Sequence, residues 1–184
     1  EDGPLTSRLQ YLIAGDNIYL KPKSVGTLVL DALLPSKRLI LFSTGTGIAP
    51  FLSVIRDPET YEKFNKVILT HTCRFEDELE YGKKIFDSIK NDNLLSEFVN
   101  DKLQLISTTT RENSSFMGRM TQWLLNGQFE SFTGKDLNVD TDRVMICGSL
   151  EMLQEHKEIC LQKGMIEGSN SAPGHFVIEK AFVD

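Results

Sequence analysis

The sequence predicts an α/β fold built around a five-stranded parallel sheet, because short apolar runs alternate with segments of helical spacing. Nearly continuous apolar runs are typical of strands that are buried on both faces of a parallel sheet. Parallel neighbours also require crossover connections, which helices usually supply. The expected strands are Arg38–Ser43, Lys66–Thr70, Leu103–Ser107, Arg143–Cys147 and Phe176–Glu179.

The segments between these strands carry the expected helices. Ile48–Arg56 places its apolar residues on one helical face, as does Glu78–Lys90. Met120–Asn126 ends at Gly127, a common C-terminal stop. The last expected helix runs from about Leu150 to Gln162 and stops near Gly164.

A different region precedes the sheet. Leu34-Pro35-Ser36-Lys37 interrupts two apolar stretches, and proline disfavours helix continuation before it. We therefore expect a boundary that separates residues 1–36 from residues 37–184. Within the first region, Leu5–Leu9 and Asn17–Leu20 are strand candidates on either side of a turn at Gly15-Asp16.

Composition excludes several classes of protein. The 184 residues are 40% hydrophobic and 25% charged, as in ordinary globular domains. No apolar run approaches the ~20 residues of a membrane helix. A net charge of −6 argues against nucleic acid as a partner. Three widely spaced cysteines form neither a metal site nor a disulfide framework, so we expect no metal and a reducing, cytoplasmic setting.

The fold class also predicts where a ligand binds. In open parallel sheets, ligands bind outside the carboxyl ends of the strands. We therefore expect one crevice lined by the residues that follow the strands, which are Thr44–Pro50, His71–Arg74, Thr108–Arg111, Cys147–Ser149 and Lys180–Phe182.

Ser43–Pro50 is a glycine-rich turn between a strand and a helix. Its two glycines let a ligand approach the backbone, and the following helix begins with unpaired amides that suit a pyrophosphate. Pro50 in the first helical turn costs no needed hydrogen bond. Pro50 also stands where a dinucleotide fingerprint has its third glycine, so a tight turn that binds nothing remains an alternative.

Several other residues have two open interpretations each. Arg111 and Arg119 flank a polar loop and either bind an extra phosphate bidentately or lie solvated on the surface. Cys147 either contacts a nicotinamide ring or fills a small space in the core. Glu179 follows an apolar strand and is suited to electrostatics or proton transfer. His71 is either catalytic or, as a lone histidine at a strand end more often is, structural, and His156 is interpreted as an ordinary helix residue.

In their order along the chain, nine segments resemble bacterial ferredoxin–NADP reductases. They are Gly3–Leu9, Pro22–Leu33, Thr44–Phe51, Leu69–Arg74, Glu78–Gly82, Thr108–Glu112, Gly118–Thr121, Asp142–Ser149 and Val177–Val183. The resemblance implies a five-stranded parallel, Rossmann-like NADP(H)-binding domain at residues 37–184. It also implies that residues 1–36 are the C-terminal part of an antiparallel β-barrel FAD-binding domain.

The resemblance implies roles for individual residues. Those assigned to FAD are Leu5, Thr6 and Ser7 at its pyrophosphate, Thr27 near the flavin or the nucleotide, and Ala181 and Phe182 over the flavin face. Those assigned to the nicotinamide nucleotide are Thr44, Gly45, Thr46, Gly47, Ile48, Ala49 and Pro50, with Gly148 and Ser149 at a neighbouring strand end. Thr72 and Arg74 would line its ribose and phosphate side, with Arg111 and Arg119 on the 2′-phosphate. Cys147, Glu179 and Phe182 would form the hydride path.

The implied activity is FAD-dependent electron transfer between NADPH and a one-electron carrier, ferredoxin or flavodoxin, by a monomeric enzyme. The family's segment that holds the isoalloxazine stands upstream of Gly3–Leu9, so we expect these 184 residues alone to bind FAD poorly. Relatives also carry a few residues beyond the Ala181–Val183 segment. The alternatives are a related flavin or oxygenase reductase and a nucleotide-binding module without a redox role. A reductase of the former kind often carries a clustered-cysteine iron–sulfur module, which is not found here.

Overall fold

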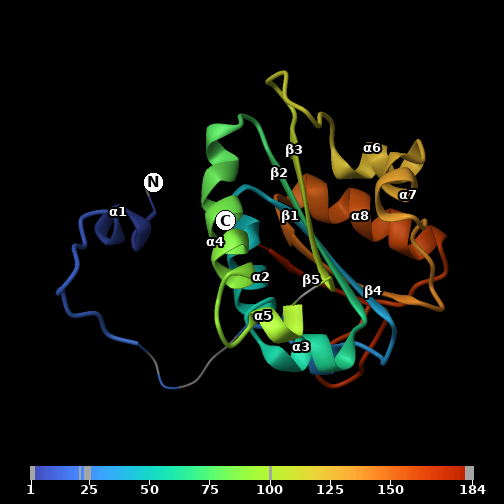
Figure 1. Cartoon of the computed structure of the whole chain (residues 1–184), viewed down its shortest axis with the longest axis horizontal. Coiled ribbons are helices and arrows are strands. Elements are labelled where there is room, and N and C mark those ends of the chain that lie inside the picture. The colour runs from blue at the N-terminus through green and yellow to red at the C-terminus, as the bar shows by residue number, and fades with distance from the viewer. Residues whose placement is uncertain (1–2, 21, 23–25, 100, 181–184) are drawn as a thin grey trace.

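The centre of the molecule is a single parallel sheet of five strands in the order β3-β2-β1-β4-β5. The computed structural model describes residues 3–20, 22, 26–99 and 101–180. The strands are β1 (Arg38–Thr44), β2 (Lys66–Cys73), β3 (Leu103–Thr109), β4 (Asp142–Gly148) and β5 (Phe176–Lys180). Figure 1 shows them twisting through the middle of the chain, as the predicted fold class requires.

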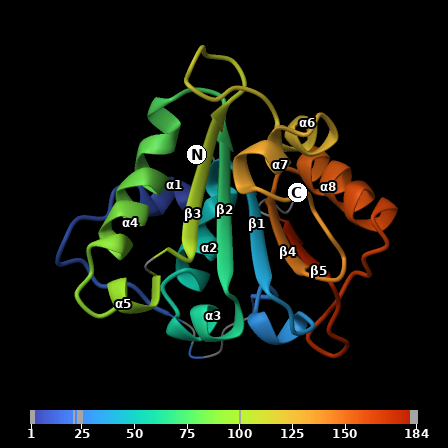
Figure 2. The ribbon, with the colours of Figure 1, turned by 45° about the vertical axis from the view of Figure 1, so that its right-hand side comes forward.

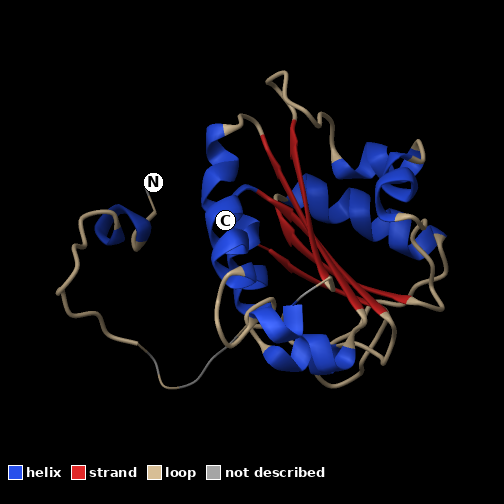
Figure 3. Cartoon of the chain, in the orientation of Figure 1, coloured by secondary structure: helices blue, strands red, loops and turns tan. Residues whose placement is uncertain are grey.

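Helices cover both faces of the sheet. One face carries η1 (Leu30–Ala32), α2 (Ala49–Val54), α3 (Pro58–Lys63), α4 (Glu80–Lys90) and α5 (Ser96–Val99). The other carries α6 (Met120–Leu125), α7 (Gln128–Thr133) and α8 (Leu150–Gln162). A short 3-10 turn, η2 (Gly45–Ile48), follows β1 directly, and a second, η3 (Asp77–Leu79), follows β2 after residues 74–76. Figure 2 shows α4 and α8 on opposite sides of the strands, and Figure 3 shows the resulting three layers.

The residues of β1 explain why the sheet has two apolar faces. Leu39 and Leu41 belong to the core beneath α2 and α3, whereas Ile40 and Phe42 belong to the core beneath α7 and α8. All four side chains are fully buried. Successive side chains of a strand point to opposite faces, so this continuous run satisfies both layers at once.

The register of the sheet brings several strand ends together. Thr44 at the end of β1 pairs with Thr72 of β2, and Ser43 pairs with Cys147 of β4. Cys147 in turn pairs with Glu179 of β5. Because all the strands are parallel, their carboxyl ends lie at one edge, which is the edge where the sequence predicts a crevice.

The five predicted strands of the sheet and the predicted helices are confirmed, with shifted ends. β2 and β3 extend beyond the predicted apolar runs to Cys73 and Thr109, because their polar ends stay paired within the sheet. The predicted helix at residues 48–56 divides into η2 and α2. The short helices α3, α5 and α7 were not expected.

The two strands expected near the N-terminus are wrong. Thr6–Leu9 forms the short helix α1, and residues 17–20 have no regular structure. A strand needs a neighbour to pair its backbone groups, and no strand of the described chain lies beside this segment. Figure 1 shows α1 and the extended chain after it to the side of the sheet.

Candidate functional site

A cleft of about 510 Å³ opens at the carboxyl edge of the sheet. Residues predicted from four of the five strand ends line it: Thr44, Gly45, Thr72, Arg74, Arg111 and Ser149. Arg119, at the start of α6, lines the same cleft. The prediction of a single crevice is therefore confirmed for these four strands. At the fifth, Ala181 and Phe182 lie outside the described residues.

The glycine-rich turn forms one wall of the cleft. Two of its positions require glycine, each for a different physical reason. Gly45 has a left-handed φ of 51°, a conformation that favours glycine. Gly47 has no room for a side chain, because an added Cβ would meet the backbone carbonyl of Cys147 and lie 2.9 Å from the Cα of Gly148. The turn and the end of β4 therefore pack backbone against backbone.

The remaining residues of the turn do not share one role. Thr44 lines the cleft and accepts a hydrogen bond from the backbone N–H of Ser149 through its hydroxyl oxygen, at 3.3 Å. Thr46 and Ala49 are exposed. Ile48 is buried in the core, and Pro50 lies in the first turn of α2. Gly148 fits directly against Thr44, since an added Cβ would meet the Thr44 hydroxyl group.

Two arginines in the cleft have uncommitted side chains. Arg74 and Arg111 follow neighbouring strands, and the N–H of Arg111 donates to the Arg74 carbonyl at 3.0 Å. Within the described chain, neither guanidinium group takes part in a hydrogen bond or an ion pair. The Glu78 carboxylate accepts from the N–H groups of Phe75 and Arg74, and these bonds lower the pKa of Glu78.

Arg119 is held differently, by two acidic side chains of α8. Its Nη1 lies 3.2 Å from Glu151 Oε1 and 3.0 Å from Glu155 Oε1, and the Glu151 carboxylate raises the pKa of Arg119. The other oxygen of Glu155 accepts from the hydroxyl group of Thr121 at 3.0 Å. Arg119 thus enters the cleft with its charge already balanced, whereas Arg74 and Arg111 bring open positive charge.

Thr72 lines the cleft, whereas Cys147 is packed in the core on the α2 face of the sheet. The hydroxyl groups of Thr72 and Thr108 are 2.8 Å apart, so Thr72 is buried with a hydrogen-bond partner. Cys147 is also buried, and burial raises the pKa of its thiol to about 11. A thiol with this pKa stays protonated at neutral pH and is a poor nucleophile.

Glu179 lies beside Cys147 in the sheet register, and its carboxylate is occupied. Its Oε2 accepts from the backbone N–H and the hydroxyl group of Thr27, at 2.9 and 2.8 Å. The N–H of Leu28 approaches the same oxygen at 3.3 Å. Thr27 and Glu179, which the sequence treats as separate candidates, are therefore direct partners.

Sequence reasoning missed Glu151 and Glu155 and gave His156 no place in the cleft. All three line it from α8. His156 is buried, its ring centroid lies 4.6 Å from that of Phe42, and burial lowers its pKa to about 4. The spacing of four between Glu151 and Glu155 puts them on one helical face, but only the packing of α6 reveals what that face meets.

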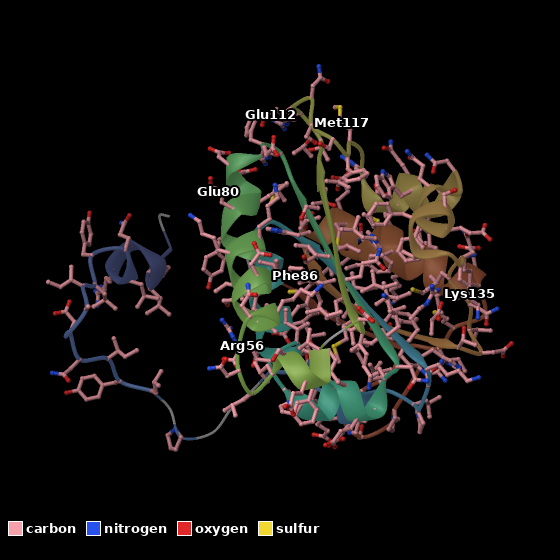
Figure 4. The ribbon with its side chains drawn as sticks, viewed as in Figure 1. Arg56, Glu80, Phe86, Glu112, Met117 and Lys135 are labelled. Atoms are coloured by element: carbon pink, nitrogen blue, oxygen red, sulfur yellow. The ribbon has the colours of Figure 1, made fainter. Side chains whose placement is uncertain are left out.

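The remaining N-terminal candidates lie away from this cleft. Thr6 and Ser7 belong to α1, and Leu5 just before it is exposed. In Figure 1, α1 stands apart from the carboxyl edge of the sheet. Glu112 and Met117 mark the loop that projects beyond β3, between Arg111 and Arg119 (Figure 4).

None of the helices in the described part of the chain is long and apolar enough to cross a membrane. Over the same residues, no group of three or more His, Cys, Asp or Glu side chains is arranged to hold a metal ion. Cys73, Cys147 and Cys160 are free and buried.

Comparison with known proteins gives consistent matches. Residues 41–158 match the family model of the oxidoreductase NAD-binding domain. A flavodoxin/ferredoxin–NADP reductase of Rhodobacter capsulatus is 51% identical over 99% of this chain and 68% of its own length. A ferredoxin–NADP reductase of Pseudomonas aeruginosa is 45% identical over 100% of the chain and 72% of its own length. The chain thus spans about two thirds of the length of such relatives.

A solved structure agrees with these matches. A ferredoxin NADP+ reductase from Neisseria gonorrhoeae, solved with bound FAD and NADP, superposes with a TM-score of 0.82 at 29% identity. The superposition covers 99% of this chain and 71% of that one. Since both the sequence and the arrangement of the elements match over nearly the whole chain, the protein belongs to the ferredoxin–NADP reductase family.

Proposed function

We propose that this protein takes part in FAD-dependent electron transfer between NADPH and a one-electron carrier, ferredoxin or flavodoxin. One observation carries the proposal: the glycine-rich turn and the two uncommitted arginines open onto the same cleft. A phosphate-bearing nucleotide is the ligand that such a combination suits. The names of the relatives at 42–51% identity supply the redox chemistry and the carrier.

The cleft fits the nicotinamide nucleotide on physical grounds. The missing Cβ atoms at Gly47 and Gly148 let the turn close tightly on β4, which leaves Thr44 and Gly45 at the surface of the cleft. We assign residues 44–50, Gly148 and Ser149 to the pyrophosphate and nicotinamide side, and Thr72 to the ribose side. Arg111 and Arg74 are assigned to the 2′-phosphate, with Arg119 beside them, because guanidinium groups bind phosphate oxygens bidentately.

We assign residues 1–36 to an FAD-binding domain and residues 37–184 to the NADP(H)-binding domain. In support, the Neisseria protein that matches 99% of this chain carries both FAD and NADP. Apolar side chains are also exposed along residues 5–20, including Tyr11, Ile13 and Tyr19, as expected of a segment that packs against something further. Leu5, Thr6, Ser7, Thr27, Ala181 and Phe182 are the proposed FAD contacts.

When bound, FAD exchanges a hydride with nicotinamide and single electrons with a carrier, and the protein supplies orientation and a dry environment. Cys147 and Glu179 would shape the contact between the two rings. The buried Cys147 thiol would remain neutral, and the bound Glu179 carboxylate would hold the Thr27 segment against β5. Neither residue is proposed to form a covalent bond.

Calorimetric titration of the chain with NADP+ and with NAD+ tests the nucleotide assignment. We expect NADP+ to bind at least tenfold more tightly, because hydrogen bonds to charged groups contribute about 1.5–3 kcal/mol each. Equal affinity for the two nucleotides would contradict it. We further propose a monomeric, cytoplasmic protein, and light scattering coupled to gel filtration would measure the oligomeric state.

A further inference from the structure

We propose that His71 is a positioning residue for the nucleotide: it holds the Gly45 carbonyl group inside the protein so that the next backbone N–H faces the cleft. The inference rests on the proposed function and deepens it, because it assigns a role to a buried residue that is not placed against the ligand. His71 stands on β2, one residue before Thr72, and is 2% exposed.

The hydrogen bond between His71 and Gly45 has only one possible direction. The distance from His71 Nε2 to the carbonyl oxygen of Gly45 is 3.0 Å. A carbonyl oxygen only accepts, so Nε2 must carry the proton and donate it. Burial lowers the pKa of His71, which keeps the ring neutral with a single N–H. The neutral ring thus acts as a fixed donor directed at the glycine-rich turn.

The geometry of the peptide bond transmits this restraint to the cleft. The described chain contains no cis peptide bond, and in a trans peptide the C=O and the following N–H point in opposite directions. When the carbonyl of Gly45 points toward His71, the N–H of Thr46 points away from it. Gly45 and Thr46 are both exposed, so the outward direction leads to the open side of the turn.

The ring is clamped from the side of α4. An added Cβ at Gly82 would lie 2.8 Å from His71 Nδ1 and 2.7 Å from Cδ1 of Ile48, the last residue of η2. On the other side, Cys73 Sγ lies 3.2 Å from His71 Nε2, and the Cys73 thiol donates to the Glu78 carbonyl at 3.8 Å. The buried imidazole is therefore closely packed between Gly82 and Cys73, beside the Gly45 carbonyl.

An unpaired atom argues that the ring is more than a space filler. His71 Nδ1 is buried and has no hydrogen-bond partner in the described chain. A buried polar atom left unpaired costs about 1–3 kcal/mol, which an apolar ring of similar size would avoid. The hydrogen bond from Nε2 to the Gly45 carbonyl is the stronger of its two polar contacts, the other being to the sulfur of Cys73, and it offsets this cost.

Three substitutions separate the N–H donor from the bulk of the ring. His71→Phe keeps an aromatic ring and removes the N–H, while His71→Gln places an amide N–H near the position of Nε2. His71→Asn has a shorter side chain that does not reach the Gly45 carbonyl, and it provides a polar counterpart to the Phe variant. The control is His175→Gln, because His175 precedes β5 at the opposite end of the sheet.

The readout is binding of two ligands to the whole chain by calorimetry. Under the proposed function, NADP+ contacts both the glycine-rich turn and the arginines. In contrast, 2′-AMP carries the 2′-phosphate but no pyrophosphate, so it tests the arginines alone. We expect His71→Phe and His71→Asn to weaken NADP+ about tenfold, since a hydrogen bond contributes about 0.5–1.5 kcal/mol. Affinity for 2′-AMP should stay within about twofold of that of the unchanged chain, and His71→Gln should restore NADP+ binding.

Three results would overturn the inference. Unchanged NADP+ affinity in both His71→Phe and His71→Asn is the first. The second is a His71→Gln variant as weak as His71→Phe, and the third is an equal loss for the two ligands, which would indicate general damage to the fold. An unchanged chain that binds neither ligand would instead refute the proposed function, and this inference with it.

Discussion

Thr27 donates its backbone N–H and its hydroxyl group to one carboxylate oxygen of Glu179, at 2.9 and 2.8 Å, although 152 residues separate the two in sequence. This pair ties the segment before η1 to the end of β5. It therefore connects the region assigned to FAD with the sheet that carries the nucleotide cleft.

Removing the Glu179 carboxylate should release this segment. We expect Glu179→Ala to increase hydrogen exchange at the amides of Thr27 and Leu28 and to lower the free energy of unfolding by about 1 kcal/mol, because three hydrogen bonds near the surface are lost. Glu97→Ala is the control, since Glu97 is exposed and has no hydrogen bond or ion pair in the described chain. Exchange rates at residues 27 and 28 that match those of the unchanged chain would contradict the role of Glu179.

The arginines of the cleft should contribute unequally. Arg111 is uncommitted, whereas Arg119 already pairs with Glu151 and Glu155. We expect Arg111→Ala to weaken the binding of NADP+ by roughly tenfold or more and to leave the binding of NAD+ almost unchanged, because the lost contact is to the 2′-phosphate. Arg119→Ala should weaken NADP+ binding less, because the 2′-phosphate must compete with two carboxylates for the Arg119 guanidinium group. Calorimetry with both nucleotides measures this, and a larger loss from Arg119→Ala would reverse the ranking.

The acidic pair on α8 should act against the phosphate. Glu155→Gln removes a negative charge 3.0 Å from Arg119, so we expect NADP+ to bind about two- to fivefold more tightly, in line with exposed ion pairs of about 0.2–1 kcal/mol. Affinity for NAD+ should stay constant. Glu158→Gln, which changes an unpaired carboxylate on the same helix, is the matched control. Weaker NADP+ binding in Glu155→Gln would mean that Glu155 orients Arg119 rather than competing for it.

The buried His156 should make the fold sensitive to acid. Burial lowers its pKa from 6.5 to about 4, so the unfolded chain binds a proton at a higher pH than the folded chain does. The stability that depends on the neutral ring is complete above pH 6.5 and is lost as the pH falls toward 4. Melting temperatures between pH 7 and 4.5 should fall less steeply in His156→Phe, which keeps the ring contact with Phe42. Parallel slopes in the two proteins would contradict this assignment.

The sheet was predictable because its strands are apolar on both faces. Arg38–Ser43 and Arg143–Cys147 are nearly continuous apolar runs in the sequence, and both form buried strands. The ends of the strands were harder to predict from the sequence. Residues 70–73 of β2 are polar or carry sulfur, yet they remain paired because the neighbouring strands of the sheet continue beside them. The helix α3 has a sequence signal of its own, because Asp57 before Pro58 caps it by accepting from the N–H of Glu59.

The N-terminal strands and half of the cleft were not predictable in this way. The short segments at residues 5–9 and 17–20, on either side of the Gly15-Asp16 turn, form strands only where a neighbouring strand pairs with them, and none of the described strands does. In the cleft, the rule of strand ends located Thr44 and Arg111. The rule could not locate Glu155, because this residue lies on a helix and its position in the cleft depends on how α6 and α8 pack.

The central claim is that one nucleotide binds across the carboxyl edge of this sheet, and an NMR titration of the isotope-labelled chain with NADP+ tests it most directly. We expect amide shifts at residues 44–49, 72–74, 110–111 and 149, with the loop at residues 136–141 at the opposite edge unaffected. Shifts confined to one strand end, or centred on residues 136–141, would contradict the account.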